Sequence, residues 1–234
     1  MLLIAFDTAT PAVTVALHDG RGVVARQTSV DARHHGELLA PAIEAVLARV
    51  GARPADLTAV AVGVGPGPYT GLRAGLITAR VFGSSLGVAV HGVCTLDIIA
   101  ARARTAAAGR EFIVATDARR REVYWAGYAS DGERLSGPRV SPPADVPPGL
   151  PIAGQGSRLY PEIGEAIEPA YPDAADLAAL VAYRIARGLA PSPADPLYLR
   201  RPDAREPGKP KRVTPVNPPG PNPPGLDATG GAVR

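Results

Sequence analysis

Three apolar runs open the chain, and each has the length and composition of a β-strand. They extend over Leu2–Thr8, Val13–Leu17 and Gly22–Thr28, and the first of them reaches an acidic residue, Asp7, near its end. The gap between the second and third runs contains His18-Asp19-Gly20, and an Asp-Gly pair between apolar runs favours a tight hairpin turn. The pattern therefore predicts an antiparallel meander of three strands.

A helical period replaces the strand pattern after the meander. Apolar side chains recur every three or four positions over residues 36–50, and Pro41 has to lie in or near the first turn of this helix to avoid a lost hydrogen bond. A short apolar run at Leu57–Val64 is typical of a strand buried on both faces, and it leads into a loop of glycine and proline at Gly65–Gly71. We then expect a helix at Leu72–Ser85, a strand at Val88–His91 and a helix at Thr95–Ala108.

A second series of strands begins after Gly109. Two apolar runs, Glu111–Thr116 and Arg121–Tyr128, are joined by a turn, and a proline-rich connector is expected over 136–151. A strand with a glycine turn at 152–157 and a helix at 173–189 follow. Strands followed by alternating strands and helices favour an α/β fold with helices packed on a mixed sheet. We therefore expect an N-terminal subdomain at 1–108 and a reduced C-terminal subdomain at 109–200.

Proline and glycine, 26 of each in 234 residues, are concentrated at the C-terminal end. Residues 201–234 hold nine prolines and five glycines, together with six cationic and three anionic side chains. Because the whole chain also has a formal charge of +3, residues 1–200 are neutral overall, and nucleic-acid binding cannot be inferred from the total charge. Residues 201–234 are expected to form a disordered basic tail.

The composition also argues against several classes of protein. The single cysteine, Cys94, rules out an intramolecular disulfide and is typical of a reducing compartment. No apolar run reaches the ~18 residues that a membrane-spanning helix needs, and the N-terminal segment lacks the basic region of a signal peptide. We expect a soluble, cytoplasmic protein with no membrane partner.

Two features could bind a nucleotide. Asp7-Thr8 at the end of the first strand is where ATP-binding folds of the actin and sugar-kinase type place phosphate and magnesium, although an Asp-Thr pair also forms simple turns. The loop 65–71 joins a strand to a helix N-terminus, which favours an anion, but its spacing matches neither a Walker loop nor GxGxxG. A phosphate cradle and a rigid packing turn both remain open. The candidate nucleotide-binding residues are Asp7, Thr8, Gly65, Gly67, Thr70 and Gly71.

The helices at 36–50 and 72–85 could form a subunit interface. The first is apolar on nearly every side, which exceeds what one buried face requires. The second carries glycines at 71, 75 and 83, and glycine in a helix interior suggests a close approach of another backbone. The alternative is packing on the chain's own sheet. The candidate interface residues are Leu38, Leu39, Ala42, Ile43, Val46, Leu72, Gly75, Leu76, Ala79 and Phe82.

Arginines at the second hairpin and a few histidines complete the candidates. Arg119, Arg120 and Arg121 precede Tyr124-Trp125, a basic and aromatic composition that RNA-contacting surfaces use, although a solvated hairpin with its rings in the core has the same pattern. His34-His35 and the single His91/Cys94 pair lack the ligand spacing of a metal site. We therefore expect no metal site, and no nucleophile–base pair of a peptidase is recognisable.

Several stretches together resemble the TsaB (YeaZ) family of tRNA threonylcarbamoyladenosine biosynthesis proteins. They are FDTATPAVTVAL, HHGELLAPAI, AVGVGPGPYTGLRAGLITAR, DARRREVY and PLYLR, and they span residues 1 to about 200. The resemblance implies an actin-like, Hsp70-like ATPase (ASKHA) fold of two βββαβα-type subdomains, the second reduced. It also implies a partner subunit of the transferase TsaD, which works with the ATPase TsaE on the tRNA adenosine 3′ of the anticodon.

The resemblance carries further expectations about catalysis and assembly. TsaD-like proteins have an HxxxH pair after the strand that follows the glycine-loop helix, whereas this chain has only His91 there. We therefore expect no catalytic residues and no cofactor of its own, with ATP or ADP and Mg²⁺ held at a joint surface with partners. A homodimer is expected when TsaD is absent, and tRNA is reached through the complex. The alternative is a free-standing ATP-dependent phosphotransferase or hydrolase that uses Asp7 and the glycine loop.

Overall fold

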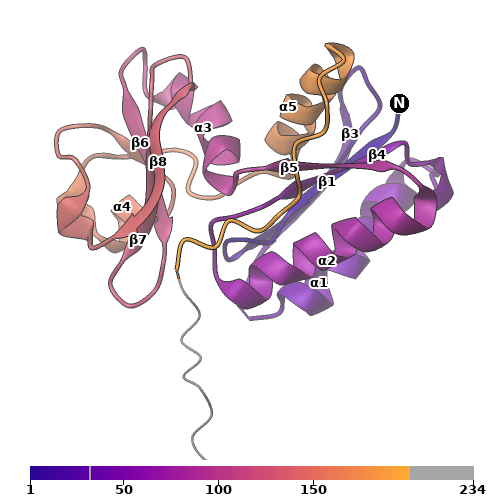
Figure 1. Cartoon of the computed structure of the whole chain (residues 1–234), viewed down its shortest axis with the longest axis horizontal. Helices are drawn as coiled ribbons and strands as arrows, with labels where there is room; N and C mark the ends of the chain where they lie inside the picture. Colours follow the sequence, from indigo (N-terminus) through magenta and orange to yellow (C-terminus); the bar gives the residue numbers. More distant parts are fainter. Residues whose placement is uncertain (32, 201–234) are drawn as a thin grey trace, which may run out of the picture. The chain divides into compact units, whose positions relative to one another are not determined.

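The computed structural model describes residues 1–31 and 33–200, and it contains two five-stranded mixed sheets (Figure 1). The predicted tail at 201–234 lies outside the described residues. In the first sheet the strand order is β3-β2-β1-β4-β5, with β1 antiparallel to β2 and parallel to β4. The strands are β1 (Leu3–Asp7), β2 (Ala12–His18), β3 (Val23–Val30), β4 (Ala59–Gly63) and β5 (Ala89–Val93). The predicted meander and the two following parallel strands are confirmed.

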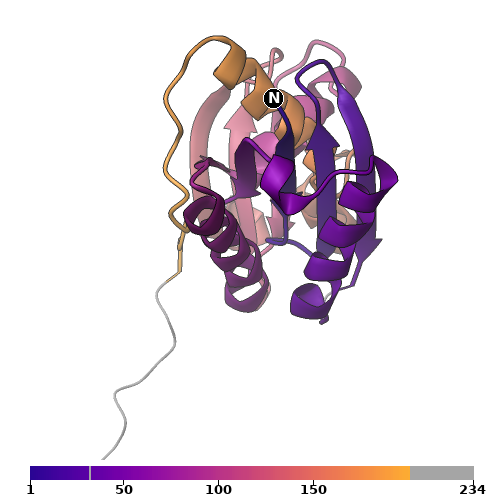
Figure 2. The ribbon, with the colours of Figure 1, turned by 90° about the vertical axis from the view of Figure 1, so that its right-hand side faces the viewer.

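Helices cover both faces of the first sheet. Side chains alternate along a strand, so Ile4 and Phe6 of β1 pack with α1 and α2, whereas Leu3 and Ala5 pack with α5. Figure 2 shows α1 and α2 side by side on one face of the sheet. The helices are α1 (His35–Arg49), α2 (Tyr69–Leu86), α3 (Thr95–Ala106) and α5 (Ala174–Ala186), and a short 3-10 helix, η1 (Pro54–Asp56), precedes β4. No helix of the described residues is long and apolar enough to span a membrane.

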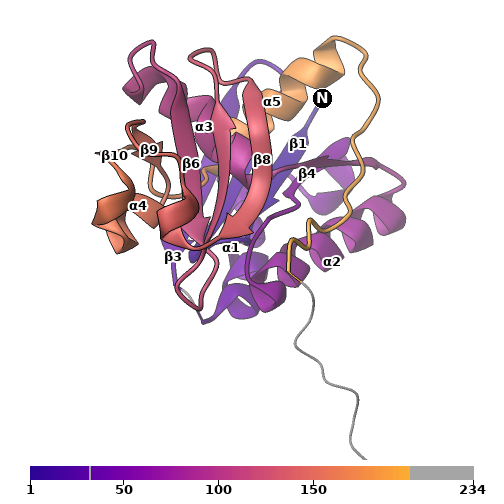
Figure 3. The same cartoon turned by 60° about the vertical axis from the view of Figure 1, so that its left-hand side comes forward.

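The second sheet repeats the strand order of the first, and its last two strands are shorter (Figure 3). Its order is β10-β9-β6-β7-β8, so that β6 is antiparallel to β7 and parallel to β9, as β1 is to β2 and β4. Its elements are β6 (Phe112–Asp117), β7 (Val123–Tyr128), β8 (Arg134–Ser141), β9 (Ile152–Ala153) and β10 (Ala166–Ile167), with α4 (Gly156–Leu159), η2 (Pro143–Asp145) and η3 (Pro161–Ile163). This duplicated order confirms the expected actin-like fold with a reduced second half.

Three details differ from the expectations. Residues 136–141 of the expected connector belong to an edge strand, β8. Pro41 lies inside α1 rather than in its first turn, and both Pro41 and the carbonyl-bearing Glu37 are exposed, so water can replace the missing hydrogen bond. Helix α5, assigned above to the 109–200 subdomain, packs on β1 and β2 of the first sheet, where Ala174 N donates to Thr14 Oγ1 at 2.9 Å.

After α5 the chain returns along the edge of the first sheet as an extended segment, residues 190–200, which we call the strap. Gly92 N donates to Ser192 O at 3.0 Å, and Leu197 N donates to Val64 O at 2.8 Å. At its end Arg200 donates to Ala118 O at 3.1 Å and pairs with Glu122, both in the second half. The strap therefore connects the edge of the first sheet to the hairpin of the second.

Candidate functional site

The Asp7 carboxyl group at the end of β1 is enclosed by neighbouring backbone and side chains. It is fully buried, and it accepts hydrogen bonds from Ala9 N and Thr95 Oγ1, both at 2.7 Å. Gly63 opposite has no side chain, and a Cβ there would lie only 1.7 Å from Asp7 Oδ2. Burial raises the pKa of Asp7, and the hydrogen bonds from Thr95 and Ala9 oppose that rise. The carboxyl group thus joins β1, β4 and α3 and is sealed from solvent.

Thr8 and the glycine loop close against each other. The Thr8 hydroxyl donates to Gly71 O at 2.7 Å and accepts from Gly75 N at 3.0 Å, so it bridges the backbone of the first turns of α2. A Cβ at Gly67 would lie 2.0 Å from Ala9 O, and a Cβ at Gly71 would lie 2.5 Å from Thr8 O. The glycines therefore let the loop pack backbone-to-backbone on residues 8 and 9. Of the two alternatives, this geometry favours the rigid packing turn.

The exposure of the six candidate nucleotide-binding residues follows from this packing. Thr70 is exposed at the start of α2, and Gly67 is half-buried. The remaining four residues are buried: Asp7, Thr8, Gly65 and Gly71. Among the described residues, no three His, Cys, Asp or Glu side chains come together in a group that could hold a metal ion. Nucleotide binding by these residues stays a prediction.

The helices α1 and α2 lie together, but most of the residues expected at an interface belong to the chain's own core. The side chains of Leu38 and Phe82 are half-buried. The other eight residues are buried, and a Cβ at Gly75 would lie 2.7 Å from Thr8 Oγ1, which explains the need for glycine there. The predicted interface set therefore needs correction, because apolar periodicity here reports packing on the first sheet. The eight are Leu39, Ala42, Ile43, Val46, Leu72, Gly75, Leu76 and Ala79.

The opposite side of α2 presents an apolar surface that the sequence analysis missed. Tyr69, Ile77 and Val81 have exposed fractions of 55%, 52% and 57%. Arg73 NH1 donates to Tyr69 Oη at 2.7 Å, and Tyr69 stacks on Tyr198 of the strap with ring centroids 5.5 Å apart. We call Tyr69, Arg73, Ile77 and Val81 the α2 outer face. Their spacing of four residues was the available signal, since it places them in one row of a helix.

The three arginines of the β6–β7 turn share an unusual backbone conformation. Arg119, Arg120 and Arg121 are exposed and have φ angles of 62°, 56° and 60°, in the left-handed region that non-glycine residues rarely enter. Asp117 holds the start of the turn, because its Oδ1 accepts from Arg119 N at 2.7 Å and its Oδ2 pairs with the Arg119 guanidinium at 3.1 Å. Together with the strap contacts at Ala118 and Glu122, these bonds fix the arginine turn, residues 119–121.

The aromatic rings beside the arginine turn face the interior. Tyr124 and Trp125 are only 7% and 5% exposed, and Trp125 Nε1 donates to Ser141 Oγ at 3.0 Å. Bases therefore have no open ring there on which to stack. Burial lowers the pKa of His91 and raises that of Cys94 to about 12, so both side chains are uncharged at neutral pH.

Comparison with known proteins adds a family to this geometry. The sequence model described as TsaD, tRNA N6-adenosine threonylcarbamoyltransferase, matches residues 13–183. An uncharacterized protein of Mycobacterium tuberculosis is 46% identical over 208 residues, covering 87% of this chain and 93% of its own. The tRNA threonylcarbamoyladenosine biosynthesis protein TsaB of Escherichia coli is 30% identical over 222 residues, covering 86% and 95%.

The solved structures agree with the sequence comparisons. YeaZ from Pseudomonas aeruginosa is 31% identical, has a TM-score of 0.72, and covers 85% of this chain and 99% of its own. A second structure from that organism, described as similar to peptidase YeaZ, has a TM-score of 0.74 at 32% identity with the same coverage. The motifs, the duplicated sheet and these relatives agree, and the chain belongs to the TsaB (YeaZ) family.

Proposed function

We propose that this chain is a non-catalytic subunit in the biosynthesis of threonylcarbamoyladenosine in tRNA, at the adenosine 3′ of the anticodon. It pairs with TsaD and supports the activity of that transferase. The name of the Escherichia coli relative and the TsaD model that matches residues 13–183 support the pathway. The sealed carboxyl group of Asp7 supports the absence of catalysis, because a group that neither substrate nor metal can reach takes no part in a reaction.

The observation that carries the pairing is the α2 outer face. Isolated exposed apolar residues are common on protein surfaces, but Ile77 and Val81 lie one turn apart in a row with Tyr69. Arg73 lies within this row and Arg80 lies beside it, and Arg80 pairs with Asp195 of the strap at 3.1 Å. The partner surface that fits is an apolar helix face with an acidic rim. The corrected interface therefore lies on the solvent side of the same helix that the sequence pointed to.

Binding of purified TsaD from the same organism tests the pairing. Wild-type chain should co-elute with TsaD in size-exclusion chromatography, and the double variant Ile77→Arg/Val81→Arg should not. About half of each side chain is exposed, so its burial contributes about 1 kcal/mol, and the cost of burying two guanidinium groups brings the loss in affinity to at least ~100-fold. Val24→Arg is the matched control, because Val24 is 43% exposed on the edge strand β3, away from α2. Co-elution of the double variant at wild-type affinity would exclude this interface.

Further parts of the proposal concern the other partners. The chain takes part in a higher complex with TsaE, forms a homodimer through the α2 outer face when TsaD is absent, and reaches tRNA through the complex. It holds no cofactor alone, and ATP or ADP with Mg²⁺ binds at a joint surface. The fixed, exposed arginine turn supports a contact with tRNA phosphates, since phosphate contacts need charge and position but no open ring.

The alternative, a free-standing phosphotransferase or hydrolase, is not favoured. It requires Asp7 to meet a magnesium ion and the loop to hold phosphate, whereas the loop packs directly on residues 8 and 9. Reconstitution separates the two functions. The purified chain should show no magnesium-dependent ATP turnover, and it should stimulate threonylcarbamoylation of tRNA when TsaD, TsaE and the threonylcarbamoyl donor are supplied. ATP turnover that disappears in Asp7→Ala would favour the alternative.

A further inference from the structure

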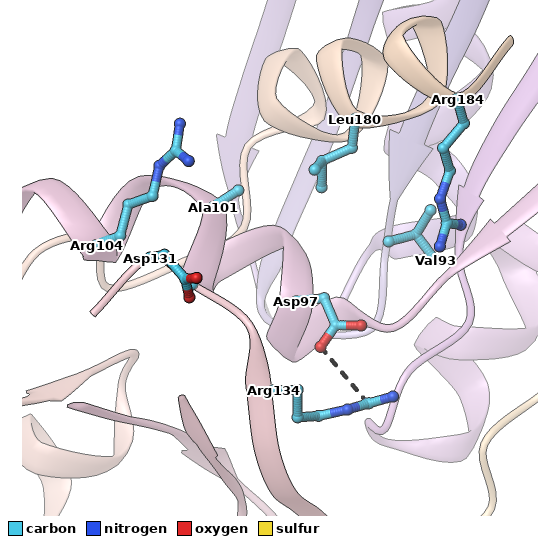
Figure 4. A pocket seen from close by; sticks show the side chains of 9 residues that line it. Val93, Asp97, Ala101, Arg104, Asp131, Arg134, Leu180 and Arg184 are labelled. Carbon is cyan, nitrogen blue, oxygen red and sulfur yellow. Dashed lines mark ion pairs between the residues drawn. The ribbon is translucent and has the colours of Figure 1, made fainter. Parts of the chain in front are cut away.

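A cavity of about 290 Å³ lies between α3, α5 and the β7–β8 hairpin. Figure 4 shows Leu180 and Arg184 extending from α5 toward Val93 and Asp97, with Arg134 of β8 beside Asp97. Asp97, Ala101 and Arg104 lie at positions i, i+4 and i+7 of α3, so they share one face of that helix. We call this space the arginine cavity.

Three guanidinium groups and two carboxyl groups line the arginine cavity. They belong to Arg104, Arg134, Arg184, Asp97 and Asp131, which gives the wall one excess positive charge. The first 200 residues are neutral overall, so this excess is local. It is also assembled from three separate elements, because the arginines are 30 and 50 residues apart in sequence. The positive character is therefore a product of the fold.

The carboxyl groups are already engaged within the chain. Asp97 Oδ1 accepts from Tyr128 Oη at 2.8 Å and pairs with Arg134 NH1 at 3.5 Å. Asp131 Oδ1 accepts from Glu133 N at 2.9 Å, which forms the hairpin turn. Neither carboxylate forms an ion pair with Arg104, whose guanidinium has no hydrogen bond or ion pair to any residue among 1–31 and 33–200.

Arg184 also keeps donors for a ligand. Its NH1 donates to Ser192 Oγ at 2.9 Å, which fixes the side chain against the strap. A guanidinium has five N–H groups in a rigid fork, so one neutral hydrogen bond leaves most of them available. Val93, Ala101 and Leu180 add an apolar wall next to the guanidinium groups. A positive group held in place beside an apolar surface is suited to an anion that carries a small apolar body.

We propose that the arginine cavity binds a small organic anion, with one carboxylate or phosphate ester group on a short apolar body. The anionic group is held by Arg184, the apolar body lies against Leu180 and Ala101, and Arg104 adds positive charge at the other end of the cavity. The volume is at the lower end of the roughly 300–1,000 Å³ usual for ligand pockets, which fits a small metabolite and is too small for a nucleotide. This site is independent of the pairing with TsaD.

Isothermal titration calorimetry of the full chain tests the site, in a zwitterionic buffer of low ionic strength. Isovalerate probes the carboxylate and glycerol phosphate probes the phosphate ester, so the two arms identify the anionic group. At least one should bind with saturation at one site per chain. If isovalerate is the ligand, it should bind at least tenfold more tightly than acetate, because each buried methylene adds about a factor of four.

Arginine substitutions locate the binding. Arg184→Gln should weaken binding about tenfold or more, and Arg104→Gln/Arg184→Gln should abolish saturation, because charge-assisted hydrogen bonds are strong. Arg187→Gln is the control: it lies one turn beyond Arg184, stacks on Tyr183 at 4.6 Å, and does not line the cavity. Binding that survives the double variant, an equal loss in Arg187→Gln, or no saturable binding of either probe would overturn the proposal. If the double variant does not fold, the single variant Arg184→Gln decides.

Discussion

A methyl group added at position 63 would occupy the space of the Asp7 carboxyl group. The Cβ of an alanine would lie 1.7 Å from Asp7 Oδ2 and 2.5 Å from its Cγ. Gly63 ends β4, which is paired with β1 on one side and β5 on the other, so the backbone cannot withdraw. Asp7 would have to move instead. That movement would break the hydrogen bonds that it accepts from Ala9 N and Thr95 Oγ1.

The expected loss of stability follows from these two effects. Overpacking of a buried site costs about 1–3 kcal/mol, and loss of a hydrogen bond to a buried polar group costs a similar amount. Gly63→Ala should therefore lower the free energy of unfolding by about 3 kcal/mol or more, a large part of the ~5–15 kcal/mol of a typical domain. Gly36→Ala is the control, because a Cβ there meets nothing within 4 Å, and alanine should raise stability by up to ~1 kcal/mol.

Urea unfolding followed by circular dichroism measures both variants against the wild type. The midpoint should fall for Gly63→Ala and rise slightly for Gly36→Ala, with an unchanged slope. A Gly63→Ala variant within about 0.5 kcal/mol of the wild type would show that the Asp7 carboxyl group can move freely. The reasoning that excludes Asp7 from nucleotide chemistry would then fail.

Four further outcomes are expected. Burial raises the pKa of Asp7 above its usual 3.8, so between the two pKa values the folded state holds a proton that the unfolded chain releases. The free energy of unfolding should therefore fall as pH rises through that interval. Urea titrations of Asp7→Asn should lack this fall, and an unchanged pH slope would refute the assignment. Arg121→Gly should raise the free energy of unfolding by up to ~1 kcal/mol, because glycine tolerates the φ of 60° at this position. It should also reduce the slope of log affinity against log salt for tRNA binding by the complex by about one unit. An unchanged slope would argue against the tRNA contact. In Gly92→Ala the new Cβ would lie 2.1 Å from the carbonyl oxygen of Pro193 in the strap, so amide hydrogen exchange across residues 190–200 should become faster. Unchanged protection of these amides would mean that the strap can shift without losing its hydrogen bonds. The Cys94 thiol, with its pKa raised to about 12 by burial, should react with a disulfide reagent at pH ~8 only when the chain unfolds, and rapid labelling of the native protein would contradict that burial.

The sequence predicted the elements of the first half well because their burial leaves a clear pattern. β1, β2 and β4 are buried on both faces and read as continuous apolar runs, and the helices show their period. β8 was not predicted because it is an exposed edge strand, which needs no alternation of apolar side chains. It also contains Pro138, which has no backbone N–H to donate and so argues against a strand in the sequence.

The candidate site was predictable only as far as local sequence allows. The Asp7-Thr8 pair and the glycine loop were found as motifs, and the structure brings them into contact. The sequence does not show whether the apolar side of α1 and α2 faces another chain or the chain's own sheet. Residues such as Leu39 were therefore predicted at an interface, whereas they belong to the core. The arginine cavity gave no sequence signal, since Arg104, Arg134 and Arg184 line one cavity only after α5 has returned to the first half.

The return of α5 has a consequence for how the protein is made. The face of the first sheet that carries Leu3 and Ala5 is covered by a helix that ends at Ala186. During synthesis this face stays open to water, and to other unfinished chains, until most of the protein has left the ribosome. A fragment that ends at residue 108 would keep a complete sheet order and yet expose that face, so it should aggregate. The two halves are copies in topology, but they mature as one unit.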